Sequence, residues 1–497
     1  MKYTFTCLIW LIATTWLLAL NPKPRTIITT DGEIDDVDSY IRMLLYSNEF
    51  EIDGLVYSSS MWHYKGDEKG TTMVSEMEMT REMYGERANL RWPGTSWMHE
   101  LLDAYEKVYP RLSTHAVGYP SADYLRSVVR VGNIDFEGEM SKDTDGSNFI
   151  KAALLDVEDP RPIYLQAWGG ANTIARALKS IEEEFSASTN WPVLRKRIAQ
   201  KAIVYTITEQ DATISNYIRT RWPEVIVMLN GAQFWVLAYG WKTAVPTQLH
   251  SYLQGEFMGE HIINNHGPLM KMYYSYGDGQ HQEGDPENIH GDPTKIENAQ
   301  WGSFGVYDFI SEGDTPAFLH LVDVGLNNFE YPDYGGWSGR MLPQGTNDWE
   351  DGSQTAEWNP YTKQLDTRYA QTRWLEAMQN DFAARADWCV LPFAEANHPP
   401  QVSLEDPNVR HVKPGEVVQL VAKTSDPDGD NLNLYWWRYS TVDSYQTEGE
   451  EGLNNTAKTF TVPSDLKQGQ TIHLILSVKD TGTPSLTRYA RIVLIGR

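Results

Sequence analysis

The stretch that decides the fold is residues 25–45, which read RTIITTDGEIDDVDSYIRMLL. The run TIITT at 26–30 predicts a strand, and an apolar face at helical spacing follows it directly, made by Val37, Tyr40, Ile41, Leu44 and Leu45. Residues 52–60, IDGLVYSSS, predict a second strand. Strand, helix and strand in so short a span indicate a βαβ unit, and therefore a parallel sheet.

The same alternation continues to about residue 396. Further strands are predicted at 161–168, 200–207 and 224–230, and a helix after Gly169 and Gly170. We therefore expect an α/β domain over residues 22–396, with a mostly parallel sheet flanked by helices. Its middle, from about 255 to 305, is rich in Gly, His, Asn and Asp and lacks periodicity, which predicts a long functional loop.

The composition changes at residues 395–407, EANHPPQVSLEDP, where the double proline indicates a linker. Beyond it, short alternating strands are predicted at 416–425, 431–440, 458–463, 471–480 and 489–495. This pattern predicts an all-β immunoglobulin-like sandwich over residues 397–497. Trp436 and Trp437 would face opposite sides of a strand, so that one is core and the other packs on the first domain or, less favoured, contacts polysaccharide.

The first 21 residues resemble a signal peptide, since Lys2 precedes the apolar run FTCLIWLIATTWLLAL. An uncleaved anchor is the alternative, although the run is short for a full span. We expect export to a periplasm or beyond, with no stable membrane insertion after cleavage. Cys7 lies in this segment, which leaves Cys389 alone and predicts no internal disulfide.

Charge and composition limit the classes of partner and ligand that the protein can have. At 497 residues the chain is too long for one ordinary core, and its net charge of -25 argues against nucleic acid or an anionic membrane surface as a partner. The 18 Trp and 27 Tyr residues fit either a large core or stacking platforms for sugar rings. Composition does not choose between these readings, and the sequence does not indicate an oligomeric state.

Four aspartates crowd the end of the first predicted strand: Asp31, Asp35, Asp36 and Asp38. In doubly wound sheets, ligands bind at the carboxyl ends of the strands. Helix capping explains one or two of these residues, because carboxylates stabilise a helix N-terminus, but it does not explain Asp31. Converging carboxylates are neutralised most simply by a hard divalent ion, Ca²⁺ or Mg²⁺, and we favour such a site over capping alone.

Four segments of the chain, beginning with the one that holds these aspartates, resemble a known enzyme family. Residues 27–45 resemble the N-terminal signature of the nucleoside hydrolases, in which a strand leads into Asp-x-x-x-Asp-Asp and a helix. Three further segments are similar to that family in the same order: QAWGGANTIARAL at 166–178, DATISNYIRTRWPEV at 211–225 and SEGDTPAFLHLV at 311–322. The whole chain is most similar to bacterial nucleoside-hydrolase-like proteins often labelled cellulose-binding.

The resemblance implies a Ca²⁺ site and the chemistry that accompanies it. Its ligands would be Asp31, Asp36, the backbone carbonyl of Trp168 and the late carboxylate Asp314. Asp31 would also be the general base that activates water beside the metal. The transition state would have oxocarbenium character, which nearby carboxylates stabilise.

The resemblance also implies sugar contacts by Asp35 and Asn216, but the sequence departs from the family in ways that bear on the substrate. Gly313 stands where many nucleoside hydrolases have a His that helps the nucleobase leave, and Thr29 replaces a leading Asp. We therefore expect a Ca²⁺-dependent hydrolase of glycosyl bonds that acts on a carbohydrate rather than a nucleoside. The alternative is a non-catalytic carbohydrate-binding protein on the same scaffold.

The leaving-group acid is sought in the loop at 259–292, where we place His266 first; Glu260 is another candidate. The remaining histidines there, like His266 itself, are equally explained as loop hydrogen-bonders: His261, His281 and His290.

Three further residues are candidate substrate contacts. Trp337 and Arg340, in YGGWSGRM, predict a sugar platform with a polar clamp or, alternatively, a tight turn around a buried Trp. Asp211 follows a predicted strand and would join the sugar site or cap the next helix.

Overall fold

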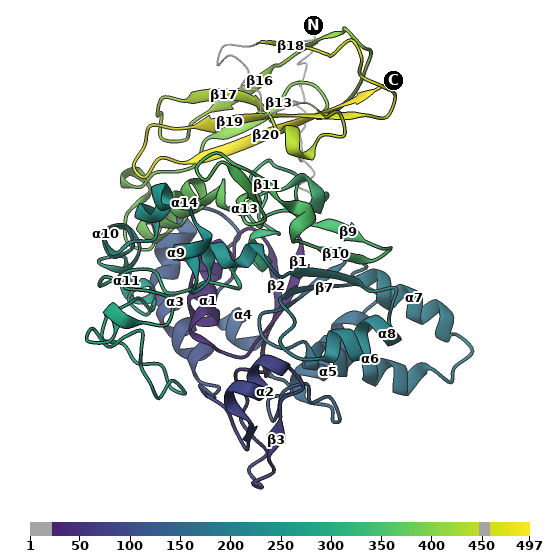
Figure 1. The fold of residues 1–497 in the computed structure, drawn as a ribbon, viewed down its shortest axis with the longest axis vertical. Helices are drawn as coiled ribbons and strands as arrows, with labels where there is room; N and C mark the ends of the chain where they lie inside the picture. The colour runs from purple at the N-terminus through teal and green to yellow at the C-terminus, as the bar shows by residue number, and fades with distance from the viewer. Residues whose placement is uncertain (1–21, 447–457) are drawn as a thin grey trace, which may run out of the picture.

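The computed structural model describes residues 22–446 and 458–497 (Figure 1). The signal peptide predicted at 1–21 lies outside these residues. Within the two described ranges, no helix is both long enough and apolar enough to cross a membrane.

The first domain is built on an eight-stranded sheet. Its order is β5 (Val129–Val131), β2 (Glu51–Tyr57), β1 (Arg25–Thr30), β6 (Ile163–Ala167), β7 (Ala202–Ile207), β8 (Ile226–Asn230), β10 (Asp348–Glu350) and β9 (Leu342–Gln344). Neighbouring strands are parallel except for the pair β9 and β10. Every residue of β1 is buried, as expected of a parallel strand covered on both faces. The predicted α/β class is confirmed.

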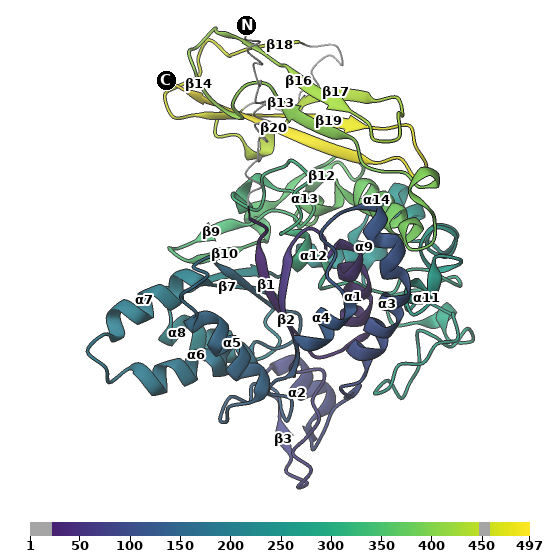
Figure 2. The ribbon, with the colours of Figure 1, turned by 180° about the vertical axis from the view of Figure 1, so that it is seen from behind.

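Helices cover both faces of this sheet (Figures 1 and 2). One face carries α1 (Ile34–Tyr46), α3 (Trp97–His115), α12 (Thr315–Leu319) and α14 (Leu375–Trp388), and the other carries α5 (Asp145–Leu155), α6 (Asn172–Phe185) and α7 (Trp191–Lys201). Adjacent residues of β1 pack into different layers. Ile28 belongs to the core under α1, α3, α12 and α14, and Ile27 belongs to the core under α5, α6 and α7. This alternation explains why the strand is buried along its whole length.

The region 255–305 contains only short helical segments among its irregular turns. These are α10 (Gly255–Met258), η4 (Gly259–Ile263), α11 (Gly267–Met270) and η5 (Ile296–Asn298). The other elements of the first domain are also short: β3 (Met73–Val74), α2 (Glu78–Tyr84), β4 (Glu86–Arg87), α4 (Ala122–Ser127), η1 (Ile214–Ile218), α8 (Arg219–Arg221), η2 (Gln233–Leu237), α9 (Trp241–Ala244), η3 (Thr247–Tyr252), η6 (Pro332–Tyr334), η7 (Ser353–Thr355), β11 (Glu357–Asn359), β12 (Gln364–Asp366), α13 (Tyr369–Thr372) and η8 (Phe393–Glu395).

The C-terminal region is strand-rich, as predicted, and has a core of its own. Its main sheet has the order β14 (Val409–Val412), β20 (Thr487–Gly496), β19 (Thr471–Lys479) and β17 (Asn433–Arg438), followed in sequence by η9 (Ser440–Val442). Two smaller pairs complete it: β13 (Gln401–Leu404) with β16 (Ala422–Ser425), and β15 (Val417–Gln419) with β18 (Thr459–Thr461). The strand predicted at 416–425 is therefore two strands, and β13 lies in the segment interpreted as a linker.

The two regions share a continuous apolar contact. Trp436 belongs to the core of the sandwich, whereas Trp437 packs on Trp374 of the first domain with ring centroids 6.1 Å apart. Trp374 also meets Tyr489 of β20 edge to face at 5.2 Å. The expected division of the two tryptophans, with the second packed on the first domain, is confirmed. Figure 1 shows the sandwich lying along α13 and α14.

Candidate functional site

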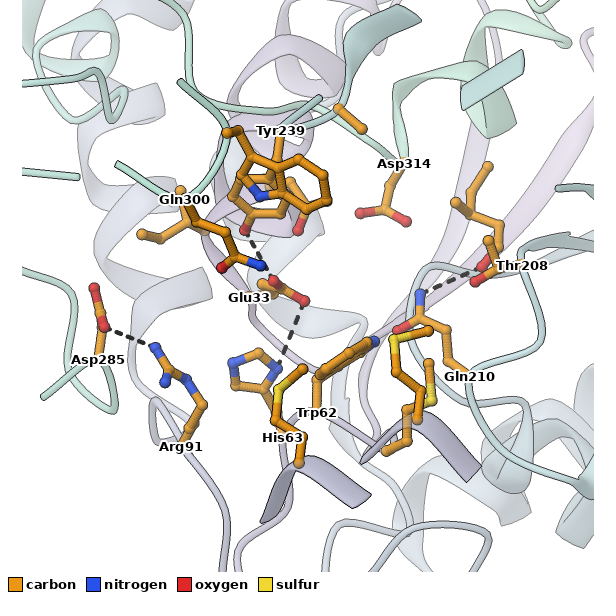
Figure 3. A pocket seen from close by; sticks show the side chains of 18 of the residues that line it. Glu33, Trp62, His63, Arg91, Thr208, Gln210, Tyr239, Asp285, Gln300 and Asp314 are labelled. Atoms are coloured by element: carbon orange, nitrogen blue, oxygen red, sulfur yellow. Dashed lines mark hydrogen bonds and ion pairs between the residues drawn. The ribbon is translucent and has the colours of Figure 1, made fainter. Parts of the chain in front are cut away.

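A cavity of about 790 Å³ opens at the carboxyl ends of the parallel strands. Its lining comes from the segments after β1, β2 and β7, which supply Glu33, His63 and Gln210, and from Asp314 before α12 (Figure 3). This is the edge at which doubly wound sheets bind ligands.

Four neighbouring carboxylates form what we call the aspartate cluster: Asp31, Asp35, Asp36 and Asp314. Asp35 and Asp314 line the cavity, and Asp31 and Asp36 are buried beside them. Asp35, Asp36 and Asp314 each offer an oxygen within 4.8 Å of the others. Asp31 is buried, and neither of its oxygens has a hydrogen-bond donor, although His63 Nδ1 lies 3.3 Å from Oδ2. Asp36 accepts a hydrogen bond from the Thr30 hydroxyl.

Backbone geometry brings the cluster together. Asp31 directly follows β1, Asp35 and Asp36 occupy the first turn of α1, and Asp314 immediately precedes α12. Two glycines permit the close approach of the remaining segments. A Cβ at Gly169 would lie 2.8 Å from Asp31 Cγ, and a Cβ at Gly313 would lie 2.6 Å from Asp35 Oδ2. A side chain at either position would displace a carboxylate.

Burial and mutual repulsion dominate the electrostatics of the cluster. Burial and then the charges of the neighbouring aspartates raise the pKa of Asp36 and of Asp314 well above the ordinary range. Burial and the charge of Asp31 raise the pKa of Asp35 to about 7. Burial alone would raise the pKa of Asp31, but its contacts with His63, Ser60 and Asp36 together lower it.

These residues fit a hard divalent ion. The donor set consists of carboxylate oxygens, which Ca²⁺ and Mg²⁺ prefer, and the oxygens of Asp31 accept no hydrogen bond, with His63 Nδ1 as their neighbour at 3.3 Å. The carbonyl of Trp168, predicted as a ligand, accepts a hydrogen bond of 2.6 Å from Gln210, a pocket residue. Burying several carboxylates without a counterion is costly, so a cation at this position would relieve the repulsion among them.

Two predicted sugar contacts lie outside the lining of the cavity. Asp211 is buried, and its oxygens accept hydrogen bonds from the backbone N–H groups of Asn172 (3.0 Å) and Thr213 (2.9 Å). It therefore holds the start of α6, a helix that precedes it in the chain, whereas the next helical segment, η1, has no side-chain cap. Asn216 is exposed, and its amide donates a 3.4 Å hydrogen bond to Glu76.

His266, Trp337 and Arg340 also lie away from the cavity. His266 Nε2 is 3.1 Å from Asp387 Oδ1, beside α14. Trp337 is fully buried and so presents no face to a sugar, as in the alternative of a tight turn around a buried ring. The Arg340 guanidinium forms a 3.1 Å ion pair with the buried carboxylate of Glu357, which leaves it structural.

Sequence reasoning missed the polar residues nearest the cluster. His63 lies 3.3 Å from Asp31 and 3.8 Å from Glu33. Tyr239 donates a 2.9 Å hydrogen bond to Glu33, whose pKa is raised by burial and by Asp35 and Asp31. Figure 3 shows the Glu33 carboxylate between Tyr239 and His63. The signal that could have identified His63 is its place in the segment that follows the second parallel strand.

Among the four loop histidines, His290 lines the cavity rather than His266. Its ring packs on Tyr239 and on Tyr276, with centroids 5.5 and 5.4 Å apart. Burial lowers the pKa of His290 to about 4, so this imidazole is neutral at neutral pH.

Comparisons with known proteins agree with this geometry. A nucleoside hydrolase-related protein from Saccharophagus degradans, associated with carbohydrate metabolism, is 26% identical, with a TM-score of 0.69 over 96% of this chain and 100% of that one. A plant nucleoside hydrolase, PpNRh1, is 12% identical over 75% of this chain and 100% of its own; its TM-score of 0.33 is too low to support an argument. No curated protein sequence matches the chain.

Family models match both parts of the chain. The model for the cellulose-binding protein Sde0182, C-terminal domain, matches residues 417–495. The model for cellulose-binding Sde182, nucleoside hydrolase-like domain, matches residues 25–341, which is more than half of the chain. The chain therefore belongs to the Sde182 family of cellulose-binding proteins with a nucleoside hydrolase-like domain.

Proposed function

We propose that the protein is a divalent-metal-dependent hydrolase of glycosyl bonds, with Ca²⁺ as the ion and a carbohydrate or glycoconjugate as the substrate. The observation that supports this is the aspartate cluster, in which Asp35, Asp36 and Asp314 converge within 4.8 Å beside the orphaned carboxylate of Asp31. The cluster forms one end of a cavity whose size suits a small-molecule ligand.

In this proposal Asp31, Asp36 and Asp314, with the carbonyl of Trp168, would hold the ion. A bound divalent cation supplies Lewis acidity toward water and sugar hydroxyls. Its ligands here are arranged by the ends of β1 and β6 and the starts of α1 and α12.

The chain's own side chains would perform the proton chemistry. Asp31, whose pKa is lowered, would accept the proton of the attacking water at a carboxylate oxygen while the water oxygen bonds to the anomeric carbon. The electron pair of the broken glycosyl bond would pass to the leaving-group atom, which takes up a proton from solvent water. Asp35 accepts a hydrogen bond from a sugar hydroxyl and orients the ring. The negative charge around the anomeric carbon stabilises the oxocarbenium-like transition state.

Calorimetry tests the metal site and activity assays test turnover. We expect Ca²⁺ to bind the wild type and to bind Asp31→Asn and Asp36→Ala much more weakly, with Asp123→Asn, an exposed carboxylate on α4, as a matched control that binds like the wild type. A screen of nitrophenyl glycosides and nucleosides follows on the same proteins. Wild-type protein that binds no divalent ion at millimolar concentration would contradict the proposal.

A non-catalytic carbohydrate-binding protein is the second candidate. The family description, cellulose-binding, favours it, as does Gly313 at the position where the resemblance leads one to expect a His. This candidate predicts that the wild type binds oligosaccharides and releases no product. Hydrolysis that Asp31→Asn abolishes would eliminate it.

The same family description supports a carbohydrate partner and a location outside the cytoplasm. The relative associated with carbohydrate metabolism points to the same class of ligand. Together with the signal peptide predicted at 1–21, these observations support an exported protein. Detection of the processed chain in a periplasmic or culture fraction tests this.

A further inference from the structure

The cavity extends well beyond the aspartate cluster to a mouth with exposed apolar side chains. Three of its lining residues are large hydrophobics that remain open to solvent: Trp301 (38% exposed), Met79 (56%) and Met83 (54%). We call these the mouth residues. Exposed apolar surface at the rim of a concave site is typical of ligand contact.

The ring of Trp301 is held in place rather than loose. It packs on Trp235, another lining residue, with centroids 5.4 Å apart and planes tilted by 56°. Gly240 lies behind the pair, since a Cβ there would come within 3.1 Å of the Trp235 ring and 3.7 Å of the Trp301 ring. A supported and partly exposed indole is a preorganised surface for stacking.

The charge of the lining selects against anions. The lining contains seven carboxylates and a single arginine, Arg91. Arg91 is already paired with Asp285 at 2.7 Å and Glu287 at 2.8 Å, so it has little attraction left for a ligand anion. A phosphate, sulfate or uronate entering the cavity would meet net negative charge even with one divalent cation bound at the cluster.

An uncharged polyhydroxylated ring suits both the exposed apolar side chains of the mouth and the negative charge of the lining. Its C–H face stacks on an indole, and its hydroxyls donate hydrogen bonds to carboxylates without needing a cation. We infer that Trp301, supported by Trp235, forms a subsite for a second, uncharged sugar ring, so that the cavity takes a neutral oligosaccharide of at least two units. This inference rests on the proposed function for the placement of the first ring at the aspartate cluster.

The test compares ligand length and charge in three full-length proteins at saturating Ca²⁺. These are the wild type, Trp301→Ala and a matched control, Trp358→Ala, which removes an indole that is 54% exposed in β11 and outside the lining. The probes are cello-, xylo-, manno- and chito-oligosaccharides of one to four units, with oligogalacturonides of the same lengths as the anionic series. Calorimetry gives Kd, and KM replaces it where a probe is hydrolysed.

We expect the wild type to bind at least one neutral disaccharide about three- to tenfold more tightly than its monosaccharide, the range expected for one aromatic contact. Trp301→Ala should lose this gain and keep the monosaccharide affinity, while Trp358→Ala keeps both. Oligogalacturonides should bind at least about tenfold more weakly than neutral chains.

Failure of the subsite and failure of the hydrolase proposal are separable. A wild type that hydrolyses a glycoside while Trp301→Ala behaves like Trp358→Ala overturns the subsite alone. Length-dependent binding that Trp301→Ala abolishes, without turnover of any probe, supports the subsite and overturns the hydrolase. If no neutral chain binds better than its monosaccharide, or if anionic chains bind best, the inference is wrong.

Discussion

Replacing Asp36 by Asn should have opposite effects on stability with and without a divalent ion. Two ionised carboxylates 4.8 Å apart, the spacing that bounds Asp35, Asp36 and Asp314, repel by about 3 kcal/mol at an effective dielectric constant near 20. Asp36 takes part in two such pairs, and protonation relieves most of that repulsion. We therefore expect Asp36→Asn to stabilise the metal-free protein by about 2 kcal/mol, since the amide oxygen still accepts the Thr30 hydrogen bond.

With Ca²⁺ bound, the wild type should be more stable than Asp36→Asn. At a free Ca²⁺ concentration of about 100 times Kd, the wild type gains about 3 kcal/mol by mass action, whereas Asp36→Asn, having lost a charged ligand, gains almost nothing. Thermal melts at pH 7.5 in EDTA and in Ca²⁺ measure both effects, with Asp123→Asn as an exposed control whose response matches the wild type. The reasoning is refuted if Asp36→Asn melts below the wild type in EDTA and retains the full response to Ca²⁺.

Three further predictions concern other parts of the structure. Gly169→Ala places a Cβ 2.8 Å from Asp31 Cγ and should weaken Ca²⁺ binding about tenfold or more in calorimetry, with little change in melting temperature; unchanged affinity would contradict it. Trp437→Ala should cost about 3–5 kcal/mol and separate the unfolding of the sandwich from that of the first domain in scanning calorimetry; a single unchanged transition would contradict it. Asp381→Asn should cost about 3 kcal/mol in urea unfolding at pH 7, because it removes the charge that pairs the buried Arg385 with the partly buried Arg488. Burial would raise the pKa of Asp381, but Arg488 and Arg385 lower it to about 2, so its stabilisation is present above the unfolded pKa near 3.8 and lost as pH falls through 2. The difference in unfolding free energy between the wild type and Asp381→Asn should shrink over that pH range, and a constant difference would contradict the prediction.

Local pattern was enough to predict the strand and helix that position the cluster. The apolar run before Asp31 and the helical face from Val37 onward are set by neighbours in sequence, and the rule for parallel sheets places their junction at the ligand edge. The late Asp314 came from a motif rather than a pattern, and the structure brings its carboxylate to Asp35 and Asp36.

The remaining contacts depend on long-range packing that pattern does not encode. His63 reaches Asp31 because β2 pairs with β1, and Tyr239 reaches Glu33 across some 200 residues of chain. The glycines around Trp337 left a sugar platform and a buried ring both open, and the ring is buried, with the guanidinium of Arg488 from β20 5.7 Å from its centroid. Strand β13 was hidden because two prolines precede it and it pairs only with the short β16.

The choice between hydrolase and binder turns on the carboxylate of Asp31. A buried carboxylate whose two oxygens lack donors is costly, and a site that only grips sugar has no need of one. His63 lies 3.3 Å away and helps to hold the pKa of Asp31 low, so that this carboxylate is ionised at neutral pH and free to accept a proton. A binder should therefore tolerate Asp31→Asn with its oligosaccharide affinity intact, whereas in a hydrolase the same substitution should remove turnover while oligosaccharide binding at the mouth persists.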